Sequence, residues 1–276
     1  MKKIWLVTGS SRGLGRALVE TVLEAGHQVV ATARNAGDLH DLSLRFGELV
    51  RTFSLDVTDW GAAARAVEYA IAEFGALDVV VNNAGYGDIG SVEDTSVADF
   101  RAQIETNLFG TIIVTKAALP YFRTRRHGHF VQLSSVGGRI GPAGRAAYSS
   151  AKWGVEGFSE SLSREVSPLN IKVTVVEPGG FRTDFAGSST KLEKGHADYD
   201  ATVGAMARFQ HEYNGKQPGD PRKAAAAIMS AVAASKPPMR LLLGSDAYAA
   251  VEANDLARID EARHWKDLSV STDFDS

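Results

Sequence analysis

The sequence contains no cysteine, and this absence excludes several kinds of site. Without a thiol the chain forms no disulfide bond, zinc–thiolate centre or cysteine nucleophile, and nothing in it indicates an oxidising compartment. Long apolar runs are also lacking: the N-terminal one covers only Ile4–Val7, and none approaches the roughly 20 residues that cross a bilayer. We therefore expect a cytoplasmic protein that does not contact the membrane.

The chain also lacks a strong excess of charge of either sign. Its formal net charge is −3 over 276 residues, so no general attraction to nucleic acid or anionic lipid is expected. The cluster of Arg123, Arg125 and Arg126 ends an expected helix, where cations favour the helix dipole. His127 and His129 flank a glycine with no further ligand nearby, which indicates a turn. The sequence predicts neither a nucleic-acid partner nor a metal.

What is present is a regular alternation of short apolar runs with longer helix-compatible segments. Continuous Val, Ile and Leu runs are typical of strands buried on both faces, which requires a parallel sheet with helices on each side. We predict a single α/β domain over residues 1–276, with a Rossmann-type doubly wound parallel sheet of about seven strands. The expected strands are Ile4–Val7, Gln28–Thr32, Val50–Leu55, Leu77–Val81, His129–Leu133, Lys172–Val176 and Arg240–Leu243. The expected helices cover about 14–25, 60–74, 97–124, 149–166 and 221–235.

The alternation stops after Pro178. Residues 180–217 show no clear period, and a connection of that length is usually functional or mobile. We interpret it as a substrate lid over the carboxyl ends of the strands, between a cofactor-binding and catalytic core (1–180) and a C-terminal extension (246–276). The large side chains that favour an apolar substrate pocket are Tyr86, Phe181, Phe185, Tyr199, Met206 and Phe209. Simple packing of the segment explains them equally well.

The first strand leads directly into TGSSRGLG, residues 8–15, and then into a helix. Glycines in this pattern give a tight turn and let the backbone approach a pyrophosphate, to which the helix N-terminus offers free N–H groups. Because the loop follows a strand and opens a helix, it predicts a dinucleotide site rather than an ordinary strand–helix turn. The expected contacts are Gly9, Ser11, Arg12, Gly13, Leu14 and Gly15.

The end of the second strand distinguishes NAD(H) from NADP(H). An NAD site usually has an acidic residue there to bind the ribose 2′-hydroxyl, but VVATARN has Ala33 followed by Arg34. Arg34 and Arg12 can instead bind a 2′-phosphate through charge-assisted hydrogen bonds, the alternative being that they are solvated loop charges. We predict NADP(H) as the cofactor.

The segment YSSAKWGVEGF places Tyr148 and Lys152 four residues apart, on one face of an expected helix. Such a pair alone is a common surface feature. Its significance comes from the other motifs along residues 1–185, which are TGSSRGLG, Asp56 after the third strand, NNAG at 82–85, Asn107, Ser135 after the fifth strand, and PGG at 178–180. Together these motifs resemble the short-chain dehydrogenase/reductase family in order and spacing.

The resemblance implies a catalytic tetrad of Asn107, Ser135, Tyr148 and Lys152. Tyr148 would exchange a proton with the substrate oxygen while a hydride passes between the carbonyl carbon and nicotinamide. Lys152 would favour the tyrosinate and hold the nicotinamide ribose, and Ser135 would hydrogen-bond the substrate oxygen. Asn107 would position a water that links Lys152 to solvent.

Further cofactor contacts follow from the same resemblance. They are Asp56 and Val57 near the adenine, Asn83, Ala84 and Gly85 along the cofactor, and Pro178, Gly179 and Thr183 near the nicotinamide. For Asn82 and Asn83, a structural role that ties neighbouring strand ends together has equal weight.

The predicted function is an NADP(H)-dependent oxidoreductase that interconverts a secondary alcohol and a ketone or aldehyde, with an aliphatic, aromatic or polycyclic small molecule as substrate. One alternative is a regulatory protein that binds the cofactor without turnover. Another is a nucleotide-sugar epimerase or dehydratase, which normally has a larger C-terminal domain. The ending after Arg240 resembles the longer steroid and retinol dehydrogenase-like members and not the glycine-rich ending of tetrameric ones. Both a homodimer and a homotetramer stay open.

Overall fold

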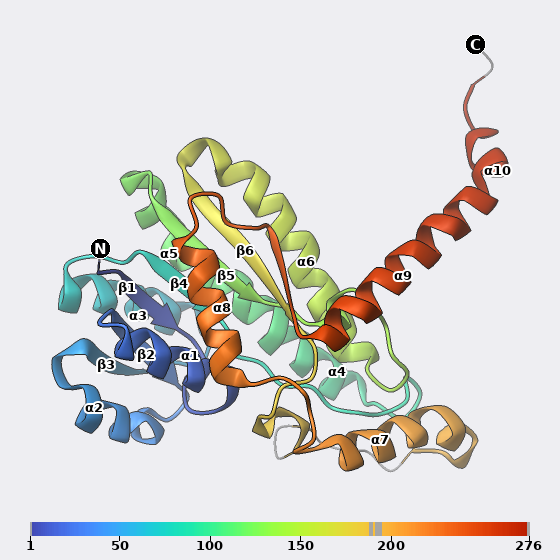
Figure 1. Ribbon diagram of the computed structural model, residues 1–276, viewed down its shortest axis with the longest axis horizontal. Helices are drawn as coiled ribbons and strands as arrows, with labels where there is room; N and C mark the ends of the chain where they lie inside the picture. Colours follow the sequence, from blue (N-terminus) through green and yellow to red (C-terminus); the bar gives the residue numbers. More distant parts are fainter. Residues whose placement is uncertain (1, 188–189, 191–194, 275–276) are drawn as a thin grey trace.

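In the computed structural model, which describes residues 2–187, 190 and 195–274, a parallel sheet forms the centre of the protein (Figure 1). Its seven strands have the order β3-β2-β1-β4-β5-β6-β7, and each neighbouring pair is parallel. The strands are β1 (Ile4–Val7), β2 (Gln28–Ala33), β3 (Val50–Ser54), β4 (Val79–Asn82), β5 (Gly128–Leu133), β6 (Ile171–Pro178) and β7 (Arg240–Leu243). The predicted doubly wound α/β fold is confirmed.

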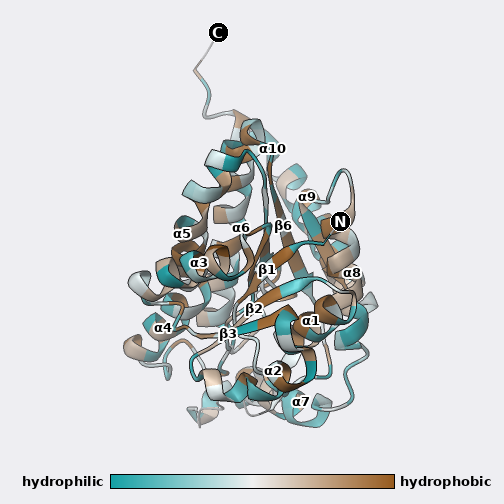
Figure 2. Cartoon of the chain, turned by 90° about the vertical axis from the view of Figure 1, so that its left-hand side faces the viewer, coloured by the Kyte–Doolittle hydropathy of each residue, from teal (hydrophilic) through white to brown (hydrophobic). Residues whose placement is uncertain are grey.

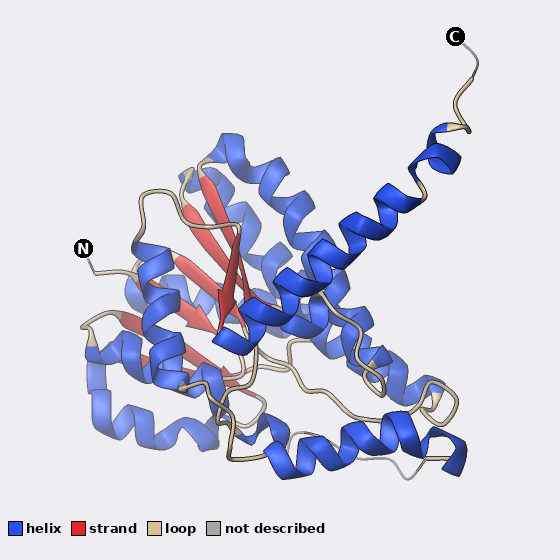
Figure 3. Cartoon of the chain, turned by 45° about the vertical axis from the view of Figure 1, so that its right-hand side comes forward, coloured by secondary structure: helices blue, strands red, loops and turns tan. Residues whose placement is uncertain are grey.

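Helices cover both faces of the sheet (Figure 3). They are α1 (Gly13–Glu24), α2 (His40–Phe46), α3 (Trp60–Phe74), α4 (Val97–Ile104), α5 (Gly110–Arg125), α6 (Ala146–Val166), α7 (Ala205–Tyr213), α8 (Pro221–Ala233), α9 (Ser245–His264) and α10 (Lys266–Val270). The helix expected over 97–124 is interrupted by a π-helical turn, η3 (Glu105–Phe109).

Local sequence signals set several helix ends. Asp59 precedes α3 and accepts a hydrogen bond from the Ala62 N–H at 3.0 Å, and Gly75 ends the helix with a φ of +79°. Asp220 caps α8 in the same way, and Pro221 occupies its first position, where no N–H is needed. These caps satisfy backbone groups that a helix end otherwise leaves without partners.

Side chains that alternate across the strands divide the core into two layers. Trp5 and Val7 pack with α1, α2 and α8 on one face, whereas Ile4 and Leu6 pack with α3, α5 and α6 on the other. Figure 2 shows the hydrophobic residues concentrated along the strands and the hydrophilic ones on the outer surfaces of the helices. Burial on both faces explains why the strands are continuous apolar runs in the sequence.

Helices α2 and α7 were not predicted, for a common physical reason. Among the residues of α2 only Leu42 is buried, and among those of α7 only Gln210. A short helix that buries one side chain has no apolar stripe, so its sequence lacks the periodicity that reveals a longer helix. In α7 even the buried residue is polar.

The C-terminal extension is a helical arm that leaves the body of the protein (Figures 1 and 3). The first half of α9 is anchored, since Ala247 and Val251 are buried and Asp255 forms an ion pair with Arg139. Farther along, large apolar side chains such as Ile259 and Trp265 are exposed to solvent. None of the described helices is long and apolar enough to cross a membrane.

Candidate active site

A cavity of about 810 Å³ opens at the carboxyl ends of the central strands, where β1 and β4 lie side by side. This is the edge at which open α/β sheets bind ligands. The predicted site residues that line it are Gly9, Ser11, Arg12, Gly13, Leu14, Arg34, Asp56, Val57, Asn83, Ala84, Gly85, Asn107, Ser135, Tyr148, Lys152, Pro178, Gly179 and Thr183. The structure therefore brings together predicted residues that are spread along the chain from Gly9 to Thr183.

Gly15 is the predicted residue that does not line the cavity. A Cβ atom at this position would stand 2.3 Å from Asn83 Nδ2 and 2.4 Å from the Gly9 carbonyl oxygen. Gly15 thus permits close packing of α1 on the strand ends, and its direct contact with a ligand stays a prediction. Gly9 has a φ of +67°, and a Cβ there would meet Ala84 Cα at 2.8 Å, so only glycine fits this turn.

Asn82 and Asn83 both tie strand ends together. The Asn83 Nδ2 atom donates to the carbonyl oxygens of Thr8 and Gly9 at 2.9 and 3.0 Å, which links β4 to the loop after β1. Asn82 Nδ2 donates to Gln132 Oε1 of β5 at 2.8 Å. The structural role weighed for this pair is confirmed, and a cofactor contact of Asn83 stays a prediction.

Arg34 and Asp56 line the cavity beyond β2 and β3. Hydrogen bonds from the backbone and hydroxyl of Thr58 lower the pKa of Asp56, and the positive charge of Arg34 lowers it further. Asp56 is therefore ionised at neutral pH. Ala33 and Arg34 end β2 without a carboxylate, which leaves a cation at the position where an NAD site usually has an acid.

Helix α6 presents Tyr148 and Lys152 to the cavity on one buried face. The Lys152 Nζ atom lies 5.7 Å from the centre of the Tyr148 ring and donates to the Leu133 carbonyl oxygen at 2.7 Å. Burial lowers the pKa of Lys152 to about 8, against the opposing effect of Glu156. Burial also raises the pKa of Tyr148, although a hydrogen bond with Ser135 opposes the shift. In this state Tyr148 holds its proton, as a general acid must.

Ser135 and Asn107 are fixed by the backbone around them. Ser135 follows β5, and its Oγ accepts a hydrogen bond from the Gly137 N–H at 3.0 Å. Asn107 lies in the π-helical turn, where Nδ2 donates to the Tyr86 carbonyl at 2.9 Å and Oδ1 accepts from the Tyr86 N–H at 3.1 Å. A Cβ at Gly85 would stand 2.4 Å from Asn107 Oδ1, so the glycine lets this side chain approach the loop after β4. π-Helical turns are frequent at functional sites.

Several polar residues of the cavity were missed, among them Arg145, Gln210 and Gln217. Arg145 is buried at the start of α6, and Gln210 and Gln217 belong to segment 180–217. Gln217 is only 1% exposed, and within the described part of the chain neither its side-chain nitrogen nor its oxygen has a hydrogen-bond partner. For Arg145 a signal existed, since it stands three residues before Tyr148 and an expected helix places such a pair on one face. Nothing in the sequence pointed to the two glutamines.

The expected apolar pocket is partly wrong. Tyr86, Phe181 and Phe185 line the cavity, but the other three predicted side chains do not. Phe209 is 53% exposed, and the Tyr199 hydroxyl donates to Glu93 outside the cavity. Gln210 and Tyr213 are the residues of α7 that line the cavity, and the Phe209 ring stacks on the Tyr213 ring with 5.0 Å between their centres. Residues 188, 189 and 191–194 of the expected lid lie outside the described residues.

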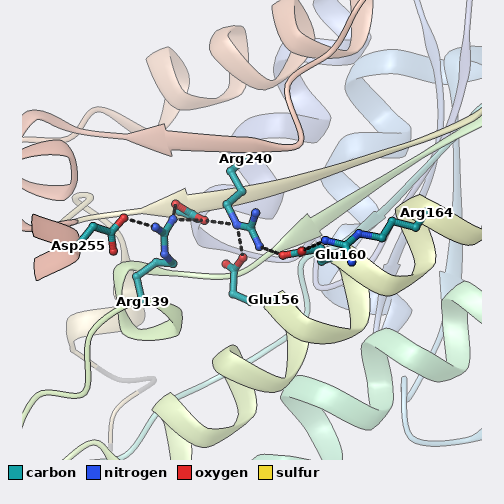
Figure 4. A network of polar contacts seen from close by, with 7 residues as sticks. Arg139, Glu156, Glu160, Arg164, Arg240 and Asp255 are labelled. Atoms are coloured by element: carbon teal, nitrogen blue, oxygen red, sulfur yellow. Dashed lines mark hydrogen bonds and ion pairs between the residues drawn. The ribbon is translucent and has the colours of Figure 1, made fainter. Parts of the chain in front are cut away.

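Behind the site, a chain of ion pairs connects α6, β6, β7 and the arm (Figure 4). Glu177, fully buried at the end of β6, accepts hydrogen bonds from Arg139 Nη1 at 3.1 Å and lies 3.5 Å from Arg240 Nε. Arg240 also binds Glu156, and Arg139 binds Asp255 of α9. Burial, and then the charge of Glu156, raise the pKa of Glu177 to about 7.

These features fit a dinucleotide in the cavity. The glycine loop has turns that a Cβ would block, and α1 begins beside it with its free N–H groups. Gln217, whose side-chain amide no described residue binds, also lines the cavity. The Tyr148–Lys152 pair lines the same cavity as the glycine loop.

Comparison with known proteins agrees with this geometry. The family model for short chain dehydrogenases matches residues 3–194. Oxidoreductase BOA17 of Botryotinia fuckeliana is 47% identical over 275 residues, which cover 99% of this chain and 100% of that protein. A short-chain dehydrogenase from Streptomyces avermitilis superposes with a TM-score of 0.93 at 39% identity, covering 99% of this chain and 100% of that one.

A more distant structure shows a bound cofactor. The closed form of serine dehydrogenase, complexed with NADP+, has a TM-score of 0.75 at 26% identity and covers 87% of this chain and 94% of that one. Taken with the family match and the buried tyrosine–lysine pair, these similarities show that the chain belongs to the short-chain dehydrogenase/reductase family of oxidoreductases.

Proposed function

We propose that this protein interconverts a secondary alcohol and a ketone, or a primary alcohol and an aldehyde, with NADP(H), and that Tyr148 is the general acid and base. The observation that carries the proposal is the buried pair of Tyr148 and Lys152, with the half-buried Ser135 beside it, in the cavity that also contains the glycine loop. A proton donor, a cation that stabilises its conjugate base and a second hydrogen-bond donor are the groups that carbonyl reduction needs.

The nicotinamide, when bound, supplies a hydride to the carbonyl carbon or accepts one from the alcohol. Tyr148 donates its phenolic proton to the carbonyl oxygen during reduction and takes it back during oxidation. Lys152 stabilises the phenolate through its charge, which lies 5.7 Å from the ring centre. Ser135 donates a hydrogen bond to the same substrate oxygen and stabilises the charge that develops there.

Residues along the cavity would hold the cofactor. The glycine loop and the N-terminus of α1 suit the pyrophosphate, Arg12 and Arg34 suit the 2′-phosphate, and Lys152 suits the nicotinamide ribose. The absence of a carboxylate at the end of β2 and the NADP+ bound by serine dehydrogenase support NADP(H) over NAD(H).

The segment 180–217 is proposed to be the substrate lid, because Phe181, Phe185, Gln210 and Gln217 all line the cavity. Three aromatic rings from this segment, those of Phe181, Phe185 and Tyr213, together with Tyr86 from the loop after β4, favour a substrate with an apolar portion. The homo-oligomeric state and the cytoplasmic location expected from the sequence stay predictions. A regulator without turnover is disfavoured, since it has no use for a Tyr–Lys–Ser cluster around a cofactor cavity.

The test is NADPH and NADH oxidation with a panel of aliphatic, aromatic and polycyclic ketones and aldehydes. We expect Tyr148→Phe to lower kcat by about 10²- to 10⁴-fold, the usual contribution of a general acid. Tyr248→Phe, a change at an exposed tyrosine of α9, is the matched control and should leave kcat unchanged. Equal turnover by wild type and Tyr148→Phe would refute the catalytic role, and a lower KM for NADH than for NADPH would refute the cofactor preference.

A further inference from the structure

Arg145 carries a buried positive charge whose hydrogen-bond acceptors are neutral. Its side chain, in a residue that is 7% exposed, donates from Nη1 to the Gly87 carbonyl oxygen at 3.1 Å and from Nη2 to Gln210 Oε1 at 3.0 Å. Across the described ranges of the chain no Asp or Glu lies within ion-pair distance of Arg145, and Asp88 acts on it only from farther away.

A buried cation in this state is incompletely compensated. Neutral acceptors recover part of the hydration that a guanidinium loses, but buried charges are normally paired with an opposite charge. Burial accordingly lowers the pKa of Arg145. A guanidinium has five N–H donors, and the two bonds to Gly87 and Gln210 leave donors available for a further ligand.

The guanidinium lies beside the reacting group of the proposed mechanism. Arg145 lines the same cavity as Tyr148 and Ser135, and its Cζ atom is 5.8 Å from the centre of the Tyr148 ring. Gly87 makes this proximity possible, since a Cβ there would stand 2.7 Å from Tyr148 Cδ2 and 3.1 Å from Arg145 Nη1. An anion bound to Arg145 would therefore be held next to Tyr148.

Gln210 supplies the oxygen that an anion would replace. It is the buried residue of α7, whose other residues are partly or fully exposed, and its contact with Arg145 joins positions 65 residues apart. An amide oxygen on Nη2 occupies the place of one carboxylate oxygen but carries no charge. A carboxylate makes shorter and stronger bonds to arginine than an amide does.

We propose that Arg145 is an anion-binding subsite of the active cavity, and that the substrate is a carbonyl compound, or the corresponding alcohol, that carries a carboxylate. The proposal deepens the function proposed above and rests on it. The carboxylate takes the place of Gln210 Oε1 on Arg145, the carbonyl faces Tyr148, and Phe181 and Phe185 contact the apolar part of the substrate.

The test compares benzoate with benzamide, which has the same shape and no charge. Calorimetric titration of the full-length protein, with and without NADP+, should show benzoate binding about 10- to 100-fold more tightly than benzamide, as expected for hydrogen bonds to a charged partner. Arg145→Met should abolish this discrimination. Arg164→Met removes an exposed arginine of α6, the helix that Arg145 precedes, and should retain the discrimination.

A second variant keeps the test decisive if Arg145→Met does not fold. Gln210→Ala removes the neutral oxygen from Nη2, so its affinity for benzoate should rise several-fold, and by more than its affinity for benzamide. The proposal is overturned if wild type binds both compounds equally or binds neither, if Arg145→Met keeps the preference, or if Gln210→Ala does not change benzoate affinity. These titrations do not depend on turnover, so they separate failure of the subsite from failure of the carbonyl reductase activity, which the Tyr148→Phe comparison measures.

Discussion

The two sides of the cavity differ in how completely their polar groups are satisfied. On the cofactor side, formed by residues 9–15, 34 and 83–85, Asn83 donates two hydrogen bonds to backbone carbonyls and Gly9 packs directly on Ala84. The substrate side, formed by Arg145 and residues 180–217, holds a cation with neutral partners and the amide of Gln217, which no described residue binds. The framework of the cofactor side is thus held by its own hydrogen bonds and close packing. On the substrate side, Arg145 has no charged partner and the Gln217 amide has no hydrogen-bond partner among the described residues.

The largest effect should come from breaking the cofactor side at Gly9. Gly9→Ala combines a left-handed φ of +67° with a Cβ only 2.8 Å from backbone Ala84 Cα, so we expect the free energy of unfolding to fall by about 3 kcal/mol. NADPH affinity, measured by fluorescence titration, should fall with it.

Gly26→Ala is the matched control for this change. Gly26 has a φ of +80°, but a Cβ added there would have no atom within 4 Å, so its substitution should cost only about 1 kcal/mol, from backbone strain. If urea denaturation gave equal losses for the two variants, close packing of the loop on Ala84 would not be what fixes the cofactor side.

An intermediate effect on stability is expected at Glu177, which directly precedes the cavity residue Pro178 at the end of β6. Its pKa is raised to about 7 from an ordinary 4.5, so the folded protein binds more protons than the unfolded chain between these values and stability falls as pH rises through that window. From pH 5.5 to 7.5, wild type should lose about 2 kcal/mol more unfolding free energy than Glu177→Gln.

The measurement is urea denaturation of both proteins at the two pH values. Glu261→Gln, at an exposed position of α9, should follow the wild-type pH dependence. If Glu177→Gln also had the wild-type pH dependence, Glu177 would be ionised in the folded protein from pH 5.5 to 7.5. The charges of Arg139 and Arg240 would then outweigh the effect of burial on its pKa.

The smallest expected effect is a change in stability that has opposite signs on the two sides of the cavity. Gln217→Leu replaces a buried amide, which no described residue binds, by an apolar side chain, and should raise the free energy of unfolding of the ligand-free protein by about 1 kcal/mol. Asn83→Leu on the cofactor side removes two satisfied hydrogen bonds and should lower it. Thermal unfolding without cofactor compares the two, and a loss of stability in both would mean that Gln217 is satisfied in solution, which would remove the difference between the sides.

The same contrast explains what could be predicted from the sequence. The cofactor side and the Tyr148–Lys152 pair depend on neighbours in the chain: a turn that needs glycine, or two residues one helical turn apart. The substrate side depends on contacts between distant positions, such as Arg145 with Gln210 across 65 residues and Arg139 with Asp255 across 116. A single sequence shows no periodicity for such pairs, so Gln210, Gln217 and the ion pairs around Glu177 had no detectable signal.

The π-helical turn around Asn107 also sets how many residues connect α4 to α5. A residue rotates about 100° around a regular helix, and a π-helical turn accommodates one residue more than an α-helical turn. Helix α5 is therefore offset by one residue relative to α4, and in that phase it buries Val114 and Phe122 against the sheet. Deleting one residue between Val97 and Arg125 would give an unbroken α-helix. The helix would then rotate by about 100° on one side of the deletion, so that either the buried side chains of α5 or Asn107 would point in a different direction. A single-residue deletion in this segment should therefore disturb either the core or the active site, whereas a substitution at an exposed position such as Val97 leaves both in place.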